Sequence, residues 1–373
     1  PCGKNDVCDE KCESMSVPTT RILIIHLEAL GAVLRSTALL APIKRKFQNA
    51  HITWVTLKPA DQLLLQNPFI DRIVTYEAGN LLALMALEFD VTFCIDKSMQ
   101  ATGLASHIQT EILYGFQLDR RSGSIVPATP FANELWSLGL SDQKKFFENQ
   151  KAETQLTCEA LELGPFQRDG YVLQLSDVER SESSARRQMW SQNAKIVIGL
   201  NTGCSNVISY KKLSVKAHRD LIQKIQARNS DFEIVLLGGK EDSHRNREIA
   251  DGLGVVQSAT EHGLRDGMVS LNACDIIVSG DSLGMHLGIA LKKWTVAWFG
   301  PTCSQEIDLF DRGVKVMSDA PCSPCWKRVC EKSTMCYDLV DLEKIYSGIL
   351  LGQKGIVNLN DQKDFNHSNG LYR

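Results

Sequence analysis

Short apolar runs with the length of β-strands alternate with amphipathic stretches along this chain, and the pattern occurs twice. Strands that alternate with helical stretches build βαβ units and a parallel sheet. A polar, charged segment without a core strand, residues 176–193, separates the two series. The sequence therefore predicts an α/β protein with two doubly wound, Rossmann-like domains facing a central cleft. The predicted strands are residues 21–26, 51–56, 72–76, 90–95, 195–200, 232–237, 275–279 and 295–299.

The composition excludes several classes of protein. Hydrophobic residues make up 43% of the 373 residues, which is typical of globular chains with large cores. A formal net charge of −3 argues against a nucleic-acid partner bound through counterion release. We find neither an apolar signal region at the beginning of the chain nor the ~20 apolar residues of a membrane span. We therefore expect a cytoplasmic protein.

One loop after a predicted strand combines several groups suited to phosphate binding. Residues 280–286, Gly-Asp-Ser-Leu-Gly-Met-His, follow the strand at 275–279, where a doubly wound domain binds its ligand. A helix beginning here presents free N–H groups to a phosphate, and Ser282 adds a hydroxyl. Asp281 could instead only cap that helix, and His286 could be a core histidine. The turn Phe-Gly-Pro-Thr at 299–302 lies at the same edge of the sheet and favours a functional site.

Other strand ends supply further candidates. Thr202 belongs to the Asn-Thr-Gly-Cys loop at 201–204, and Lys211 lies in Tyr-Lys-Lys before a helix. A lysine there could bind a diphosphate as a point charge, or simply be solvated. Glu241 could accept sugar hydroxyls or only interact with a helix dipole. Because no G-x-G-x-x-G motif opens either half, a dinucleotide dehydrogenase is disfavoured.

The twelve cysteines are unusual for a cytoplasmic chain. Four of them have the spacing C-x2-C-x4-C-x5-C: Cys322, Cys325, Cys330 and Cys336. Four thiolates can close a tetrahedral shell around structural zinc or iron, or hold an Fe–S cluster, and the spacing does not distinguish these. Disulfides or free thiols are the alternatives. Near the other end, Cys2, Cys8 and Cys12 could form a second, incomplete metal site.

From about Arg21 to Leu350 the chain resembles glycosyltransferase family 9, the ADP-heptose heptosyltransferases of lipopolysaccharide synthesis. The resemblance depends on Leu-Gly-Ala-Val-Leu-Arg-Ser-Thr-Ala-Leu at 30–39, Tyr-Gly-Phe-Gln-Leu-Asp at 114–119, and the motifs at 201–213, 281–286 and 299–302. It implies a GT-B fold and inverting transfer without a catalytic divalent metal. The implied organisation is a cysteine-containing segment (1–20), an acceptor domain (21–185), a nucleotide-sugar domain (186–350) with a cysteine knuckle (322–336), and a tail (351–373).

The resemblance also implies roles for individual residues. Lys211 corresponds to the lysine on the donor phosphates, Asp281 and His286 to the donor-site pair, and Glu241 to a nucleotide-side carboxylate. The implied partners are an ADP-sugar and a lipopolysaccharide-core or protein acceptor, with possible oligomerisation and association with the inner face of the inner membrane. The cysteine run is similar to that of a family branch with Cys-Ser-Pro-Cys, and to the four-cysteine iron site of autotransporter heptosyltransferases, whose spacing is longer.

One position departs from the family pattern. The family has Gly-Asp after the first strand, with the aspartate as general base, whereas this chain has Gly31-Ala32. Three explanations stay open: an engineered inactivating substitution, a relocated base, or a chain that binds sugar nucleotides without catalysis. Glu28 is the first relocated candidate, followed by His26 and Asp96. A nucleotide-sugar epimerase or dehydrogenase is a further alternative.

Overall fold

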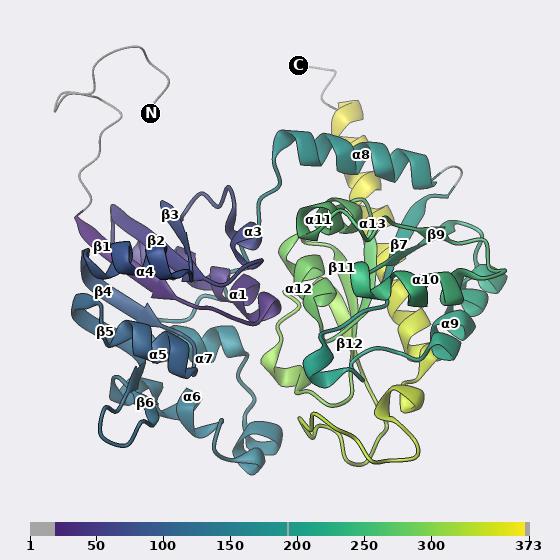
Figure 1. The fold of residues 1–373 in the computed structure, drawn as a ribbon. Coiled ribbons are helices and arrows are strands. Elements are labelled where there is room, and N and C mark those ends of the chain that lie inside the picture. Colours follow the sequence, from purple (N-terminus) through teal and green to yellow (C-terminus); the bar gives the residue numbers. More distant parts are fainter. Residues whose placement is uncertain (1–18, 192–193, 370–373) are drawn as a thin grey trace.

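A computed structural model describes residues 19–191 and 194–369, with side chains to residue 356. The chain forms two α/β domains side by side, coloured purple to blue and green to yellow in Figure 1. Helices cover both faces of each sheet, which confirms the predicted GT-B architecture. No helix in the described part of the chain is both long and apolar enough to cross a membrane. Cys2, Cys8 and Cys12 lie outside the described residues.

The N-terminal domain has a six-stranded sheet in the order β3-β2-β1-β4-β5-β6. All pairs are parallel except β5 with β6. The strands are β1 Thr20–Ile25, β2 Ala50–Thr56, β3 Arg72–Thr75, β4 Glu88–Cys94, β5 Gln109–Leu118 and β6 Ile125–Pro127. The helices are α1 Leu30–Ser36, α2 Leu40–Lys46, α3 Asp61–Leu64, α4 Ala78–Met85, α5 Met99–Ala105, α6 Asn133–Ser137 and α7 Glu153–Ala160.

The C-terminal domain repeats this topology with a fully parallel sheet in the order β12-β11-β10-β7-β8-β9. The strands are β7 Ile196–Asn201, β8 Phe232–Leu237, β9 Val256–Gln257, β10 Ile276–Gly280, β11 Trp294–Phe299 and β12 Gly313–Met317. The helices are α8 Asp177–Ser191, α9 Val215–Arg228, α10 Ser243–Ala250, α11 Leu264–Asn272, α12 Leu283–Ala290 and α13 Leu342–Asn369.

Local sequence accounts for these elements. The four residues 22–25 of β1 are completely buried, as expected for a central parallel strand covered by helices on both faces. Helix α9 begins where Ser214 accepts a hydrogen bond from the backbone N–H of Ala217, a standard N-cap. Its buried residues follow one helical face, and they are His218, Leu221, Ile222 and Ile225.

An apolar core continues from one domain into the other. Val33 and Leu34 of α1 belong to the same hydrophobic cluster as Met285 and Leu287 of α12. Figure 1 shows these two helices side by side between the sheets. The predicted domain boundary at 185/186 falls inside α8, which packs on α11 and β7 of the C-terminal domain. Residues 351–369, part of the predicted tail, continue helix α13.

Candidate active site

The predicted site residues gather around the switch points of the two sheets. The strand order reverses between β1 and β4 in one sheet and between β7 and β10 in the other. Doubly wound domains bind ligands beyond the carboxyl ends of the strands at such a switch point. His26 follows β1 and Asp96 follows β4, whereas Asp281 directly follows β10. Strand topology therefore positions each group at an edge where ligands bind.

Three candidates in the C-terminal domain form one cluster. Lys211 Nζ lies 3.8 Å from Asp281 Oδ2, and His286 Nε2 lies 3.9 Å from Asp281 Oδ1. All three side chains are largely buried, with the Lys211 side chain 17% exposed. Gly280 makes the approach possible, because a Cβ there would come within 2.0 Å of the Lys211 carbonyl oxygen. The loop at 208–211 is thereby packed directly on the end of β10.

Burial and neighbouring charge set the protonation of this cluster. Burial disfavours the ionised Asp281 carboxyl, but Lys211 and His286 outweigh it, so the pKa of Asp281 is lowered. Burial, reinforced by the Arg35 guanidinium, lowers the pKa of His286 to about 3. At neutral pH the site thus contains a carboxylate and a neutral imidazole beside the Lys211 side chain. The Nδ1 atom of His286 is buried without a hydrogen-bond partner among the described residues.

Two other predicted donor residues are engaged within the protein. The Ser282 hydroxyl accepts a hydrogen bond of 2.9 Å from Asn201 Nδ2, so it belongs to the scaffold of the loop. Thr202 is fully buried, and its hydroxyl lies 3.0 Å from the Leu237 carbonyl oxygen and 2.5 Å from Asn246 Oδ1. In this conformation the Thr202 hydroxyl is therefore not exposed to a bound sugar nucleotide.

Glu241 is exposed beside the end of β8, and its carboxylate folds back over Gly239. The next residue, Asp242, was not predicted and is buried. Asp242 accepts a hydrogen bond from the Gly239 N–H and fills the space that a side chain at Gly203 would need. Burial raises the pKa of Asp242. Asp242 therefore joins the loops that follow β7 and β8.

On the N-terminal side, two of the relocated-base candidates bind each other. His26 Nε2 lies 3.2 Å from Asp96 Oδ1, and Asp96 Oδ2 accepts the Leu27 N–H. Burial lowers the pKa of His26. Glu28 is exposed at the end of β1, and Ala32 lies partly exposed in the first turn of α1. Of the two carboxylate candidates for the base, Asp96 is thus paired inside the protein, whereas Glu28 has no such partner among the described residues.

Four charged residues that the sequence did not reveal lie between the domains. Arg35 Nη2 is 2.6 Å from Glu153 Oε2, and Lys145 Nζ is 3.6 Å from Glu306 Oε1 of the C-terminal domain. Arg35 outweighs the effect of burial and lowers the pKa of Glu153. Burial, followed by the Glu153 charge, raises the pKa of Glu306 to about 7. Of these four residues, only Arg35 could have been noticed in the sequence, because it is the one charged residue in the mainly apolar run 30–39.

The four-cysteine loop, residues 322–336, contacts the charged residues between the domains, because Lys145 Nζ lies 3.9 Å from the centre of the Trp326 ring. Its thiols are free, with Cys322 exposed and Cys336 buried. Burial and the other three thiols raise the pKa of Cys336 to about 11, so the four groups share one neighbourhood. Within the described ranges, however, no three His, Cys, Asp or Glu side chains are arranged to hold one metal ion. The closed four-thiolate shell therefore stays a prediction.

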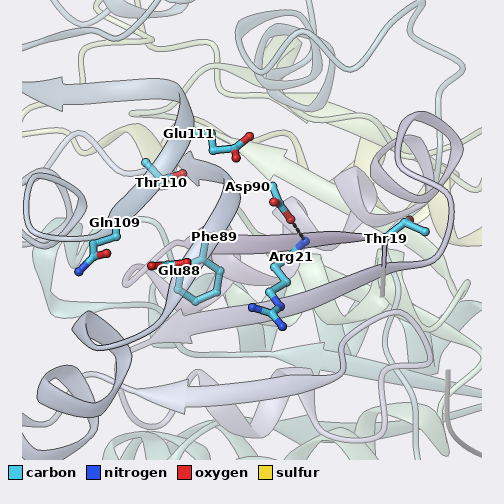
Figure 2. Close-up of a pocket in the computed structure, with 8 residues that line it drawn as sticks. All are labelled: Thr19, Arg21, Glu88, Phe89, Asp90, Gln109, Thr110 and Glu111. Atoms are coloured by element: carbon cyan, nitrogen blue, oxygen red, sulfur yellow. Dashed lines mark hydrogen bonds between the residues drawn. The ribbon is translucent and has the colours of Figure 1, made fainter. Parts of the chain in front are cut away.

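A hollow of about 350 Å³ lies elsewhere, at the amino ends of β1, β4 and β5 (Figure 2). The strands are parallel, so this edge is opposite to the switch point of the N-terminal sheet. In Figure 2 the Asp90 carboxylate of β4 accepts a hydrogen bond from the backbone N–H of Arg21 in the neighbouring strand β1. Its lining residues are Thr19, Arg21, Glu88, Phe89, Asp90, Gln109, Thr110 and Glu111. None of them belongs to the predicted site.

Two α/β domains of this topology define a GT-B glycosyltransferase fold, and solved structures share it. The family 9 glycosyltransferase of Veillonella parvula has a TM-score of 0.70 at 16% identity, covering 91% of this chain and 98% of its own. The Escherichia coli ADP-heptose LPS heptosyltransferase II has a TM-score of 0.63 at 17% identity, covering 89% and 99%. The dodecameric, iron-containing heptosyltransferase TibC of enterotoxigenic E. coli, in complex with ADP-D-beta-D-heptose, has a TM-score of 0.54 at 11% identity, covering 91% and 78%.

Residues 82–335, more than half of the chain, match glycosyltransferase family 9 (heptosyltransferase). The chain belongs to this family and is a glycosyltransferase, as the sequence motifs predicted. No curated relative matches it significantly.

Proposed function

We propose that this glycosyltransferase transfers a heptose, or a similar sugar, from an ADP-sugar to a hydroxyl group with inversion at the anomeric carbon. Family membership supports the reaction class. The observation that carries the donor assignment is the buried cluster of Lys211, Asp281 and His286 at the switch point of the C-terminal sheet.

Each member of the cluster has a chemical role in this proposal. When the acceptor oxygen attacks the anomeric carbon, the bond to the diphosphate breaks and its electron pair leaves with the nucleotide. The Lys211 ammonium stabilises this negative charge, without a catalytic divalent metal. Ionised Asp281 orients Lys211, and neutral His286 can hydrogen-bond to the donor without repelling Lys211. Exposed Glu241 is positioned to accept nucleotide or sugar hydroxyls, while Ser282 and Thr202 support the loops.

An inverting transfer also needs a base near the acceptor hydroxyl. Alanine at position 32 cannot serve, and we assign the role to Glu28, which is exposed at the end of β1. His26 and Asp96 instead support the loop that carries Glu28, because the Asp96 carboxylate binds the His26 ring and accepts the backbone N–H of Leu27. The acceptor oxygen then loses its proton to the Glu28 carboxylate as the new bond forms.

We further propose a lipopolysaccharide-core or protein acceptor, met in the cytoplasm or at the inner face of the inner membrane. The dodecameric state of TibC motivates a test of oligomerisation. For the four-cysteine loop we propose a structural zinc or iron ion, because a closed thiolate shell leaves no open position for substrate.

The decisive experiment is a screen of nucleotide sugars with purified protein, in which nucleoside diphosphate release and sugar transfer are both measured. An ADP-sugar at 100 times its Kd should stabilise the protein by about 2.7 kcal/mol. Lys211→Ala should reduce this protection, which is measured from the melting temperature of each free variant, because the substitution also leaves the buried Asp281 carboxylate without its partner and lowers that temperature.

Lys216→Ala is the matched control, since Lys216 is 84% exposed and pairs only with Asp220 on the surface of α9. It should retain the full protection. Equal protection of both variants would mean that Lys211 does not contact the donor.

A further inference from the structure

The four-cysteine loop is attached to the donor-site segment through Tyr210. The Tyr210 hydroxyl donates a hydrogen bond to the carbonyl oxygen of Lys327 in the loop. The Tyr210 ring is 5% exposed and packs in a small core with Ala320 and Cys336. This tyrosine immediately precedes Lys211, so its ring anchors the backbone that carries the donor-site lysine.

The same loop also supports the turn after β11. The backbone N–H groups of Cys325 and Trp326 donate to the Pro301 carbonyl oxygen at 3.1 and 2.8 Å. The Ser323 hydroxyl donates to the Gly300 carbonyl oxygen. A Cβ at Gly300 would come within 2.8 Å of Cys336 Sγ, so the loop and the turn pack in direct contact.

Both supported segments converge on Asp281. One carries Lys211, whose ammonium is 3.8 Å from the carboxylate. The other carries Thr302, which follows Pro301; its buried hydroxyl lies near this carboxyl but has no hydrogen-bond partner among the described residues. The four-cysteine loop thus supports two of the segments beside the Asp281 carboxylate. The loop itself contributes no side chain to the contact between Lys211 and Asp281.

We propose that Tyr210 is a positioning residue for donor binding: through its hydrogen bond to Lys327 in the four-cysteine loop, it holds Lys211 in register with Asp281. The proposal rests on the proposed donor role of Lys211. Without the hydroxyl the ring can remain packed, but the segment 208–211 loses its polar attachment to the loop. Lys211 then spends less time in the geometry that meets a diphosphate.

The test is a double-mutant cycle in which ADP is titrated calorimetrically into the parent, Tyr210→Phe, Lys211→Ala and the double variant. Loss of one neutral hydrogen bond predicts ADP binding about three- to tenfold weaker for Tyr210→Phe. Lys211→Ala, which removes a charged contact, should weaken binding by about tenfold or more. Because Tyr210 acts through Lys211, the double variant should bind ADP no more weakly than Lys211→Ala.

Tyr337→Phe is the matched control. Tyr337 packs against the same small core, and its hydroxyl makes no hydrogen bond with any described residue. It should bind ADP like the parent. A purely structural role of Tyr210 would instead lower the melting temperature and leave ADP affinity unchanged.

Two results would overturn the role of Tyr210 and leave the proposed donor site intact. One is an unchanged ADP affinity in Tyr210→Phe, and the other is that Tyr210→Phe weakens ADP binding by the same factor whether Lys211 is present or replaced by alanine. A parent protein that binds no ADP would contradict the proposed donor site, and this inference with it. The two failures are therefore distinguishable in one set of titrations.

Discussion

Gly31 of the N-terminal domain lies against the imidazole ring of His286 in the C-terminal domain, and a Cβ at Gly31 would come within 2.5 Å of the ring atom Cδ2. The two helices α1 and α12 therefore approach each other closely where the acceptor and donor halves of the proposed site meet. A glycine is needed here for close approach and not for an unusual backbone angle.

Gly31→Ala should lower the transfer rate, because the added methyl group forces the His286 ring or the α1 helix to move. Overpacking of this kind typically lowers stability by about 1–3 kcal/mol, and an activation barrier raised by the same amount would slow transfer roughly five- to 100-fold. Gly103→Ala in α5 is the matched control, since nothing lies within 4 Å of its Cβ position. Equal rates for the two variants would show that this contact does not align the domains.

A second prediction concerns the missing aspartate. Ala32 lies in the first turn of α1, where the helix dipole favours a carboxylate, and one turn before Arg35. If the chain lacks an efficient base, Ala32→Asp should raise the transfer rate by about 10²–10⁴-fold. ADP affinity should change little, because the base acts on the acceptor.

The companion variant is Glu28→Gln. Loss of transfer in this variant, with ADP binding intact, would identify Glu28 as the base of an active parent. If neither substitution changes a measurable transfer rate, both assignments of the base are wrong.

The sequence predicted the fold because its signals are local. The central strands β1, β7, β8 and β10 are short, mainly apolar runs whose ends are followed by glycine or polar residues within a few positions. Strands β5, β6, β9 and β12 lack so clear a signal and were not predicted. The same logic placed Lys211, Asp281 and His286 near one another, since strand ends of a parallel sheet lie at one edge. It did not indicate side-chain orientation, and so Thr202 was expected at the donor although its hydroxyl points into the interior.

Contacts between the domains could not be predicted in this way. Lys145 and Glu306 are distant in sequence and belong to different domains, and no periodic pattern relates them. Their pairing depends on how the finished domains dock. The contact between Gly31 and His286 has the same origin, although both residues belong to motifs that the sequence already singled out.

A third prediction concerns the four-cysteine loop. Anaerobically prepared protein should contain about one zinc or iron per chain by elemental analysis, and Cys325→Ser should remove it and destabilise the loop. Cys274→Ser is a suitable control, because this thiol is buried in the core away from the loop and burial raises its pKa to about 12. A brown, oxygen-sensitive absorption would indicate an Fe–S cluster, whereas zinc would be colourless. Metal-free parent protein would exclude the site.

The last prediction is a pH dependence of stability that originates at Glu306. Burial and the charge of Glu153 raise the pKa of Glu306 from its ordinary value of 4.5 to about 7, against the attraction of Lys145. Between these two values the unfolded chain has released a proton that the folded chain retains. The free energy of unfolding should therefore fall as pH rises from about 4.5 to 7.

Glu306→Gln should remove this contribution, because glutamine does not titrate. Relative to the parent, the variant should gain stability on going from pH 5 to pH 8, on the order of 1–3 kcal/mol, in denaturant unfolding. Comparison with the parent cancels the buried histidines, whose lowered pKa values give the opposite slope. Glu343→Gln is the control: hydrogen bonds from Arg228 and Lys224 lower the pKa of Glu343 to about 2, so its effect should be the same at both pH values. Parallel pH profiles for Glu306→Gln and the parent would show that the Glu306 carboxyl is already ionised at pH 5, paired with Lys145.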